Sequence, residues 1–282
     1  MAYSERRFIT RDGLSLYFRE YGDQISTATP VVCLAGFTRN AGDFDLVASR
    51  LAGKRRVLCP DLRGTGRSDY DPDWHNYRPE TYISDITQLI SHNNIRKVIV
   101  VGTSYGGLLA LILGFVMPLS IAGIVLNDVG PEFENEKLQG VLDYIRVDRP
   151  QPDWESARES IMTHRSGTAF QNAELFETMV RNTFRKGKDG LLHFDWDVNI
   201  AKPWIKSKGA FTNLWPYFRK LHPIPLLAFR GEVSEMFSKE SFVQLGREYP
   251  GARLVTVSRT GHAPTLAEPE CVAALDEFLC DL

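Results

Sequence analysis

Cysteine is scarce in this chain of 282 residues, and its few positions follow no metal-binding pattern. Structural metal sites built from thiolates need cysteines at short, regular spacings such as C-x-x-C. No such pair occurs, so the sequence predicts no metal cofactor. The cysteines fall on expected strands and on the last helix, where we expect reduced thiols in or near the core; they are Cys33, Cys59, Cys271 and Cys280.

The chain also lacks an excess of charge of either sign. Its 33 basic and 35 acidic residues give a formal net charge of −2 at pH 7, which gives no reason to expect a polyanionic partner. Phosphate-binding patterns are missing as well, because neither Gly102–Gly107 nor Gly64–Gly66 completes G-x-G-x-x-G or a P-loop ending in lysine. The sequence therefore predicts neither a nucleic-acid partner nor an organic cofactor that binds through phosphate.

Long hydrophobic runs are absent. The strongest, Leu108–Met117, is far shorter than the roughly 20 apolar residues that a membrane-spanning helix needs. Residues Met1–Arg7 contain no apolar signal segment. These absences favour a cytoplasmic protein without a membrane partner, and the sequence gives no indication of its oligomeric state.

Strand patterns do alternate with helical patterns along much of the chain. Strands are expected at 31–35, 57–60 and 97–101, joined by helices such as Glu80–His92, whose apolar residues share one face. This alternation is typical of parallel strands linked by crossovers. A hairpin is expected at the start of the chain, across Asp12-Gly13.

The most informative segment joins a strand to a helix through one serine. Gly102-Thr103-Ser104-Tyr105-Gly106-Gly107 lies between the β-branched run Val98–Val101 and the helix-like run Leu108–Met117. In so tight a turn, the positions two residues before and two residues after the serine have no room for a Cβ. Both positions, 102 and 106, are glycine here. The N–H groups of the first helical turn would face a developing oxyanion. The pattern favours Ser104 as an exposed nucleophile for acyl transfer.

His262 is the favoured general base among six histidines. It follows the expected strand Arg253–Val257 and precedes the expected helix Pro269–Leu282, so its loop can lean over the sheet edge toward Ser104. The other five fit this position less well; they are His75, His92, His164, His193 and His222. A neutral imidazole beside a serine can accept its proton.

Three carboxylates compete for the third member of a triad. Glu232 and Glu235 follow the apolar run Pro225–Phe229 in a glycine turn, and Asp128 follows an earlier strand-like run. Asp128 would end at the carboxyl edge of the sheet, where ligands bind in open α/β folds. Each of the three is able to accept the Nδ1 proton of His262 and to stabilise the imidazolium that forms during proton transfer.

Four motifs, in order, resemble the α/β-hydrolase superfamily over nearly the whole chain. They are Leu34-Ala35-Gly36-Phe37, Asp61–Ser68, the serine turn and Gly261-His262-Ala263-Pro264. The resemblance implies that Ser104 and His262 are nucleophile and base, and that the backbone N–H groups of Phe37 and Tyr105 form the oxyanion hole. It also implies an α/β fold with a mostly parallel eight-stranded sheet, helices on both faces and a largely helical cap inserted after the sixth strand. Ala35 departs from the family's usual histidine but leaves the backbone donors in place.

The same resemblance favours Glu235 as the acid, because the family usually has an aspartate in that loop. Glutamate is one methylene longer than aspartate, so either the backbone at Glu235 or the position of His262 must then differ from that of the family. Some relatives take the acid from the end of the sixth strand, 24 residues after the nucleophile, and Asp128 lies 24 residues after Ser104. Asp128 is therefore the alternative acid, and Glu232 is third.

The strand–helix alternation is lost at 131–222, which we interpret as the cap, while 1–130 and 223–282 form the hydrolase core. Four of the five tryptophans lie in this segment; they are Trp154, Trp196, Trp204 and Trp215. Most of its aromatic residues are expected to form the core of a small lid. A minority facing the cleft would favour a small-molecule substrate that is apolar or aromatic.

These residues together favour a serine hydrolase that cleaves a small carboxylic ester or lactone through an acyl-enzyme, a mechanism that requires no metal or organic cofactor. A serine triad is also compatible with carbon–carbon bond hydrolysis and with cofactor-free perhydrolysis, but ester or lactone hydrolysis is the most economical choice. A non-catalytic small-molecule receptor of the same fold is a further alternative, because a fold by itself does not fix function. Ser104 argues against the aspartate nucleophile of relatives that act on haloalkanes or epoxides.

Overall fold

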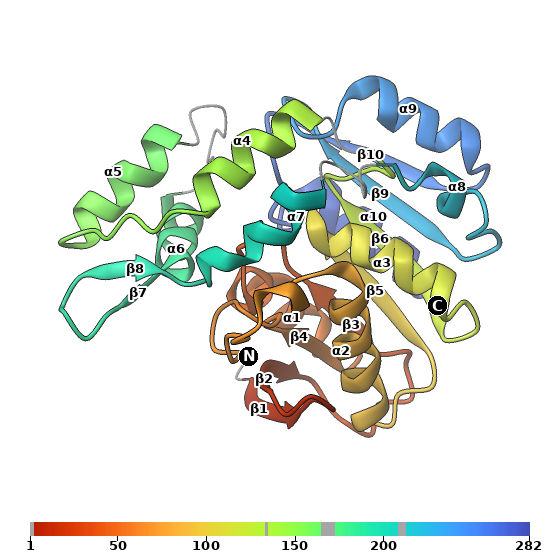
Figure 1. The fold of residues 1–282 in the computed structure, drawn as a ribbon. Helices are drawn as coiled ribbons and strands as arrows, with labels where there is room; N and C mark the ends of the chain where they lie inside the picture. The colour runs from red at the N-terminus through yellow and green to blue at the C-terminus, as the bar shows by residue number, and fades with distance from the viewer. Residues whose placement is uncertain (1–2, 133–134, 165–172, 208–212) are drawn as a thin grey trace.

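The computed structural model describes residues 3–132, 135–164, 173–207 and 213–282. Within them, eight strands form one sheet in the order β1-β2-β4-β3-β5-β6-β9-β10 (Figure 1). β2 is antiparallel to β1 and β4, whereas β4, β3, β5, β6, β9 and β10 are parallel. Their bounds are β1 Ser4–Ile9, β2 Ser15–Tyr21, β3 Val31–Leu34, β4 Val57–Pro60, β5 Val98–Thr103, β6 Ile121–Asn127, β9 Leu226–Gly231 and β10 Arg253–Val257. The mostly parallel sheet and the hairpin at Asp12-Gly13 are confirmed.

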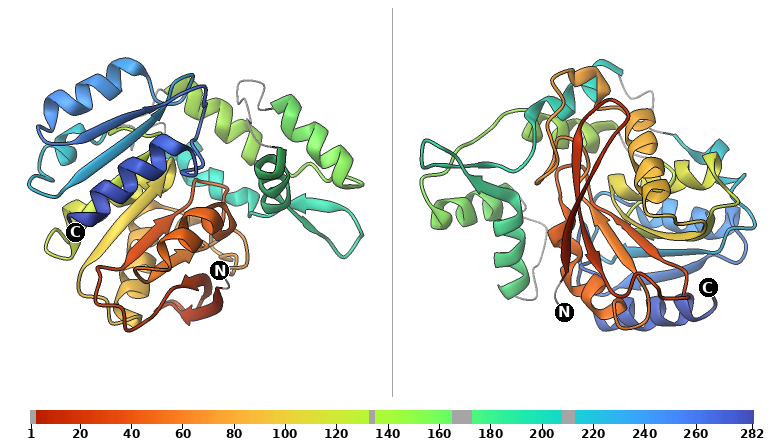
Figure 2. Two further views of the ribbon diagram at one scale, coloured as in Figure 1. Left: turned by 180° about the vertical axis from the view of Figure 1, so that it is seen from behind. Right: turned by 90° about the horizontal axis from the view of Figure 1, so that it is seen from below.

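Helices cover both faces of this sheet. Successive side chains of a buried strand point to opposite faces, and both sets are apolar here. One set packs with α2 (Pro79–His92), α3 (Tyr105–Val116) and α9 (Lys239–Glu248). The other packs with α1 (Asp45–Leu51), which follows the short η1 (Ala41–Phe44), and with α10 (Pro269–Cys280). Figure 1 shows α2 and α3 in front of the sheet, and the left view of Figure 2 shows α1 and α10 on the other side.

The loops that carry the candidate residues leave the same edge of the sheet. Phe37 follows β3, Ser104 follows β5, Asp128 follows β6 and His262 follows β10. These four strands are parallel, so their carboxyl ends meet at one edge. Residues far apart in the sequence are thereby brought to one place.

The segment between β6 and β9 adds helices and a short hairpin. Its described elements are α4 Asn135–Ile145, α5 Trp154–His164, α6 Ala173–Thr183, β7 Phe184–Lys186, β8 Leu192–Phe194, η3 Val198–Ala201, α7 Lys202–Ser207 and α8 Trp215–Phe218. Figure 1 shows α5, α6 and the β7–β8 hairpin to one side of the sheet. Trp196, Trp204 and Trp215 are buried, so these three side chains contribute to packing.

Among the described residues, no helix combines the length and the apolar character needed to cross a bilayer. All four cysteines are free thiols. Three are buried, as expected, whereas Cys280 at the end of α10 is exposed and departs from the expectation of a thiol in or near the core.

Arg63 is buried in the loop after β4 and contacts three carboxylates. Its Nε and Nη2 lie 2.7 and 2.8 Å from Asp85, and its Nη1 contacts Asp71 and lies 2.9 Å from Asp12. Removing the guanidinium leaves buried carboxylates unpaired, so Arg63→Met is expected to lower the free energy of unfolding by about 3–5 kcal/mol in urea titrations. The matched Arg67→Met variant loses a half-exposed ion pair and should change by less than about 1 kcal/mol. Equal losses in the two variants would contradict this assignment.

Candidate active site

Ser104 lies on a strained turn between β5 and α3, with φ 52° and ψ −119°. A Cβ at Gly102 would lie 2.3 Å from the carbonyl oxygen of Gly106, and a Cβ at Gly106 would lie 2.0 Å from that of Leu34. Glycine is therefore required at both flanking positions, as the sequence pattern indicated. The N–H of Ser104 donates to the carbonyl oxygen of Asn127 at 3.0 Å, which attaches the turn to the end of β6.

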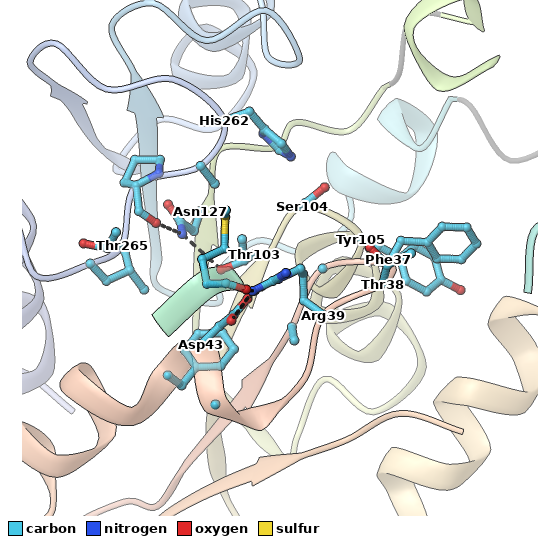
Figure 3. Close-up of a pocket in the computed structure, with 18 of the residues that line it drawn as sticks. Phe37, Thr38, Arg39, Asp43, Thr103, Ser104, Tyr105, Asn127, His262 and Thr265 are labelled. Atoms are coloured by element: carbon cyan, nitrogen blue, oxygen red, sulfur yellow. Dashed lines mark hydrogen bonds and ion pairs between the residues drawn. The ribbon is translucent and has the colours of Figure 1, made fainter. Parts of the chain in front are cut away.

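Two backbone N–H groups beside Ser104 are available as oxyanion donors. Tyr105 is the first residue of α3, where an N–H has no intrahelical acceptor. Phe37 lies in the loop after β3, and neither of these N–H groups donates to another described residue. In Figure 3 the side chains of Phe37 and Tyr105 lie on the side of Ser104 opposite His262. Both N–H groups therefore remain candidates for the oxyanion hole.

His262 forms a hydrogen bond with a buried carboxylate. Its Nδ1 lies 2.6 Å from Oδ2 of Asp128, whose side chain is 0% exposed. The carboxylate of Asp128 accepts the hydrogen bond from Nδ1. The other ring nitrogen, Nε2, therefore keeps its lone pair and is able to accept a proton. Figure 3 shows the imidazole of His262 and the hydroxyl of Ser104 facing the same space. A base and a hydroxyl that face one space are the pair that proton transfer requires, once the two atoms come within hydrogen-bond distance.

The preference for Glu235 as the acid is wrong in this geometry. Glu235 is exposed in the turn after β9, and no hydrogen bond joins it to His262 within the described residues. Glu232 is exposed too, and its carboxylate accepts from the N–H of Arg259 at 2.7 Å. The chain reverses immediately after β9 and directs both glutamates outward, so of the three candidate carboxylates it is the alternative, Asp128, that contacts His262.

Two residues that support Asp128 were not singled out from the sequence. The backbone N–H of Gly231 donates to Asp128 Oδ1 at 2.8 Å, and the hydroxyl of Ser234 donates to Oδ2. A Cβ at Gly231 would lie 2.4 Å from the carbonyl oxygen of Gly261, so glycine allows the histidine loop to pass this closely. The glycine after the apolar run was visible as a signal, whereas nothing in the pattern marked Ser234.

Ser104 and His262 both line a cavity of about 570 Å³. One wall comes from the sheet edge and includes Phe37 and Tyr105, and the opposite wall comes from α4, α6 and α7. The lining is largely apolar; from the helices it includes Leu138, Val141, Leu175, Met179 and Trp204. A cavity of this size and character is suited to a small apolar ligand.

Arg39 also lines the cavity, but its charge is compensated. Its Nε and Nη2 each lie 2.6 Å from a carboxylate oxygen of Asp43, and its Nη1 donates to the hydroxyl of Thr183 at the end of α6. A guanidinium paired in this way attracts a ligand carboxylate weakly. Arg39 therefore connects the loop after β3 with α6 rather than offering a free anion site.

The side chain of Tyr105 is buried among other aromatic rings. Its ring centroid lies 4.8 Å from that of Phe37, 5.7 Å from that of Tyr82 and 5.5 Å from that of Trp204. Burial raises the pKa of the Tyr105 phenol well above its usual range, so the phenol stays neutral. The side chain packs among these rings at the cavity wall, while its backbone N–H stands at the start of α3, next to Ser104.

Comparisons with known proteins show which family the chain resembles. The model of the alpha/beta hydrolase family matches residues 31–275. A 3-hydroxybutyrate-oligomer hydrolase from Cupriavidus necator is 30% identical over 271 residues, which cover 93% of this chain and 91% of that protein. A proline iminopeptidase from Lactobacillus crispatus is 25% identical over 278 residues, and the match covers 84% of this chain and 92% of that protein.

A solved structure is more similar still in sequence. The crystal structure of an alpha/beta hydrolase from Novosphingobium aromaticivorans superposes with a TM-score of 0.93 at 39% identity, covering 100% of both chains. The chain belongs to the alpha/beta hydrolase family, as its four motifs indicated, and it is a hydrolase.

Proposed function

We propose that this protein is a serine hydrolase that cleaves small carboxylic esters or lactones through an acyl-enzyme. Ser104 is the nucleophile, His262 the general base and Asp128 the acid, and the N–H groups of Phe37 and Tyr105 hold the oxyanion. The observation that carries the proposal is the 2.6 Å hydrogen bond from His262 to buried Asp128 beside a serine on a strained, glycine-flanked turn.

The proposed reaction proceeds in two halves. Nε2 of His262 accepts the Ser104 proton as Oγ attacks the ester carbonyl, and the two N–H groups stabilise the negative oxygen that forms. The same proton passes from His262 to the leaving alkoxide, which departs as an alcohol. A water molecule then gives its proton to His262 and its oxygen to the acyl carbon, and the acid leaves while Ser104 regains a proton. For a lactone, the alcohol and the acid are the two ends of one product.

The lining of the cavity supports an uncharged, predominantly apolar acyl group. Asp43 compensates the charge of Arg39, so a substrate carboxylate gains little from this guanidinium. The similarity to a 3-hydroxybutyrate-oligomer hydrolase makes esters of short hydroxy acids the first class to test. We expect their terminal carboxylate to lie away from the apolar wall, because burying an unpaired charge there is unfavourable.

A substrate panel together with a serine-directed probe tests this proposal. We expect hydrolysis of short nitrophenyl esters, hydroxy-acid oligomers or lactones, no hydrolysis of diketones, and a fluorophosphonate adduct on the peptide that contains Ser104. A folded protein that forms no adduct and hydrolyses none of these compounds would favour the receptor alternative. Faster cleavage of diketones than of every ester would instead support carbon–carbon bond hydrolysis.

A further inference from the structure

Asn127 lies at the point where the three segments of the proposed triad meet. It is the last residue of β6, directly before Asp128, and it is paired in register with Thr103, which directly precedes Ser104. Its side chain is almost completely buried, with the residue 1% exposed. Figure 3 shows Asn127 and Thr103 beside each other at the floor of the cavity, below His262.

The side-chain amide of Asn127 donates to both of the other segments. Nδ2 lies 3.0 Å from the hydroxyl oxygen of Thr103 and 2.8 Å from the carbonyl oxygen of Pro264, two residues beyond His262. The main-chain oxygen of Asn127 accepts the N–H of Ser104 at 3.0 Å. A single residue therefore contacts the serine turn and the histidine loop and is covalently joined to the acid.

The other hydrogen bonds described for the histidine loop do not reach the serine turn. The carbonyl oxygen of Thr260 accepts from Val233 at 3.0 Å in the turn after β9, and the N–H of Thr265 donates to Glu268 at 2.8 Å within the loop. The hydrogen bond between Nδ1 of His262 and Asp128 orients the imidazole. It does not by itself set the distance between the histidine loop and the serine turn. Asn127 supplies a direct connection between the two.

We propose that Asn127 is a positioning residue that holds the His262 loop at the distance from Ser104 that proton transfer requires. The proposal rests on the serine-hydrolase function proposed above. Both amide protons have acceptors, one on each catalytic segment, so the donors rather than the shape of the side chain perform this role. Misplacing a catalytic group by about 1 Å lowers rates by up to about a hundredfold.

Two substitutions separate donor chemistry from shape. Asn127→Asp keeps the outline of the side chain but presents an oxygen to the Pro264 carbonyl, acceptor against acceptor, and Asn127→Ala removes the amide entirely. Both should lower kcat for a short nitrophenyl ester by about ten- to a hundredfold, with KM within about threefold. The new carboxylate in Asn127→Asp favours the imidazolium, so the acid limb of its kcat/KM profile should move to higher pH.

A matched control is Asn93→Asp at the end of α2. Asn93 also uses Nδ2 to donate to a carbonyl oxygen, that of Leu89, at 2.9 Å, but it lies outside the cavity lining. Its variant should keep the wild-type kcat and pH profile. Thr103→Val removes one of the two acceptors of Asn127 and provides a second test if Asn127→Ala fails to fold; we expect an intermediate loss of kcat.

One readout does not depend on turnover. The proton between His262 and Asp128 should give a downfield NMR resonance that is broadened or lost in both Asn127 variants and retained in Asn93→Asp. The proposal is overturned if Asn127→Asp keeps both this resonance and the wild-type kcat. It is also overturned if only Asn127→Ala loses kcat and the resonance. If the wild type is no faster than Ser104→Ala, the serine-hydrolase function fails, and the NMR comparison alone decides whether Asn127 holds the histidine loop.

Discussion

Replacing Ser104 by alanine is expected to lower kcat for the best ester by about 10⁵–10⁶-fold, because without Oγ no acyl-enzyme forms and only the remaining oxyanion donors and binding contacts act. KM should change little, since the hydroxyl contributes mainly to the chemical step. The variant should also lose labelling by a fluorophosphonate. Initial rates at saturating substrate and intact-protein mass spectrometry measure both effects.

The control for Ser104→Ala is Ser84→Ala, which removes an exposed hydroxyl on α2, away from the cavity. It should keep wild-type kcat and labelling. Thermal unfolding of Ser104→Ala should match the wild type closely, because the backbone strain of the turn is present with either side chain. A Ser104→Ala protein that keeps more than a small fraction of its esterase rate would show that another group attacks the carbonyl.

Replacing Asp128 by asparagine is expected to lower kcat by about 10⁴-fold, while Glu235→Gln changes it by less than about twofold. The amide of asparagine has no charge to stabilise the imidazolium, and an N–H directed at Nδ1 would favour the wrong tautomer of His262. Glu235 is exposed and does not contact His262. Steady-state kinetics of the two variants under identical conditions measures the difference.

Loss of structure is a separate effect at position 128, and it must be measured alongside activity. The carboxylate accepts from the Gly231 N–H and the Ser234 hydroxyl, so removing it leaves buried donors unpaired. Ser234→Ala removes one of these donors without touching the charge, and it should cost some stability but far less activity than Asp128→Asn. If Glu235→Gln were the more damaging variant, the acid would have to be reassigned.

The fold was largely predictable because its signals are local. The apolar strand runs, the Asp12-Gly13 turn and the helical periodicity of Glu80–His92 each restrict a few neighbouring residues, and the structure has β1, β2 and α2 at these places. The serine turn was predictable for the same reason. Its two glycines are demanded by atoms only a few ångströms away, at the Gly106 and Leu34 carbonyls.

The identity of the acid was not predictable with the same certainty. Asp128, Glu232 and Glu235 all follow strands that end at one edge of the sheet, so their order in the chain does not separate them. The direction of each side chain depends on the two or three backbone angles after each strand, and Asp128 adopts a positive φ of 54° that turns its carboxylate inward. Its expected place at the carboxyl edge of the sheet and its spacing of 24 residues from Ser104 were the advance signals for Asp128.

By itself, the sequence determined the family, most strands and helices of the core along the chain, and which serine and histidine lie at the carboxyl edge, because each of these follows from short-range patterns and from the parallel direction of the strands. Only the tertiary structure decided that Asp128 and not Glu235 meets His262, and that Asn127, Gly231 and Ser234 surround this pair. These contacts join residues more than 100 positions apart, where packing rather than local propensity sets the distance between two side chains.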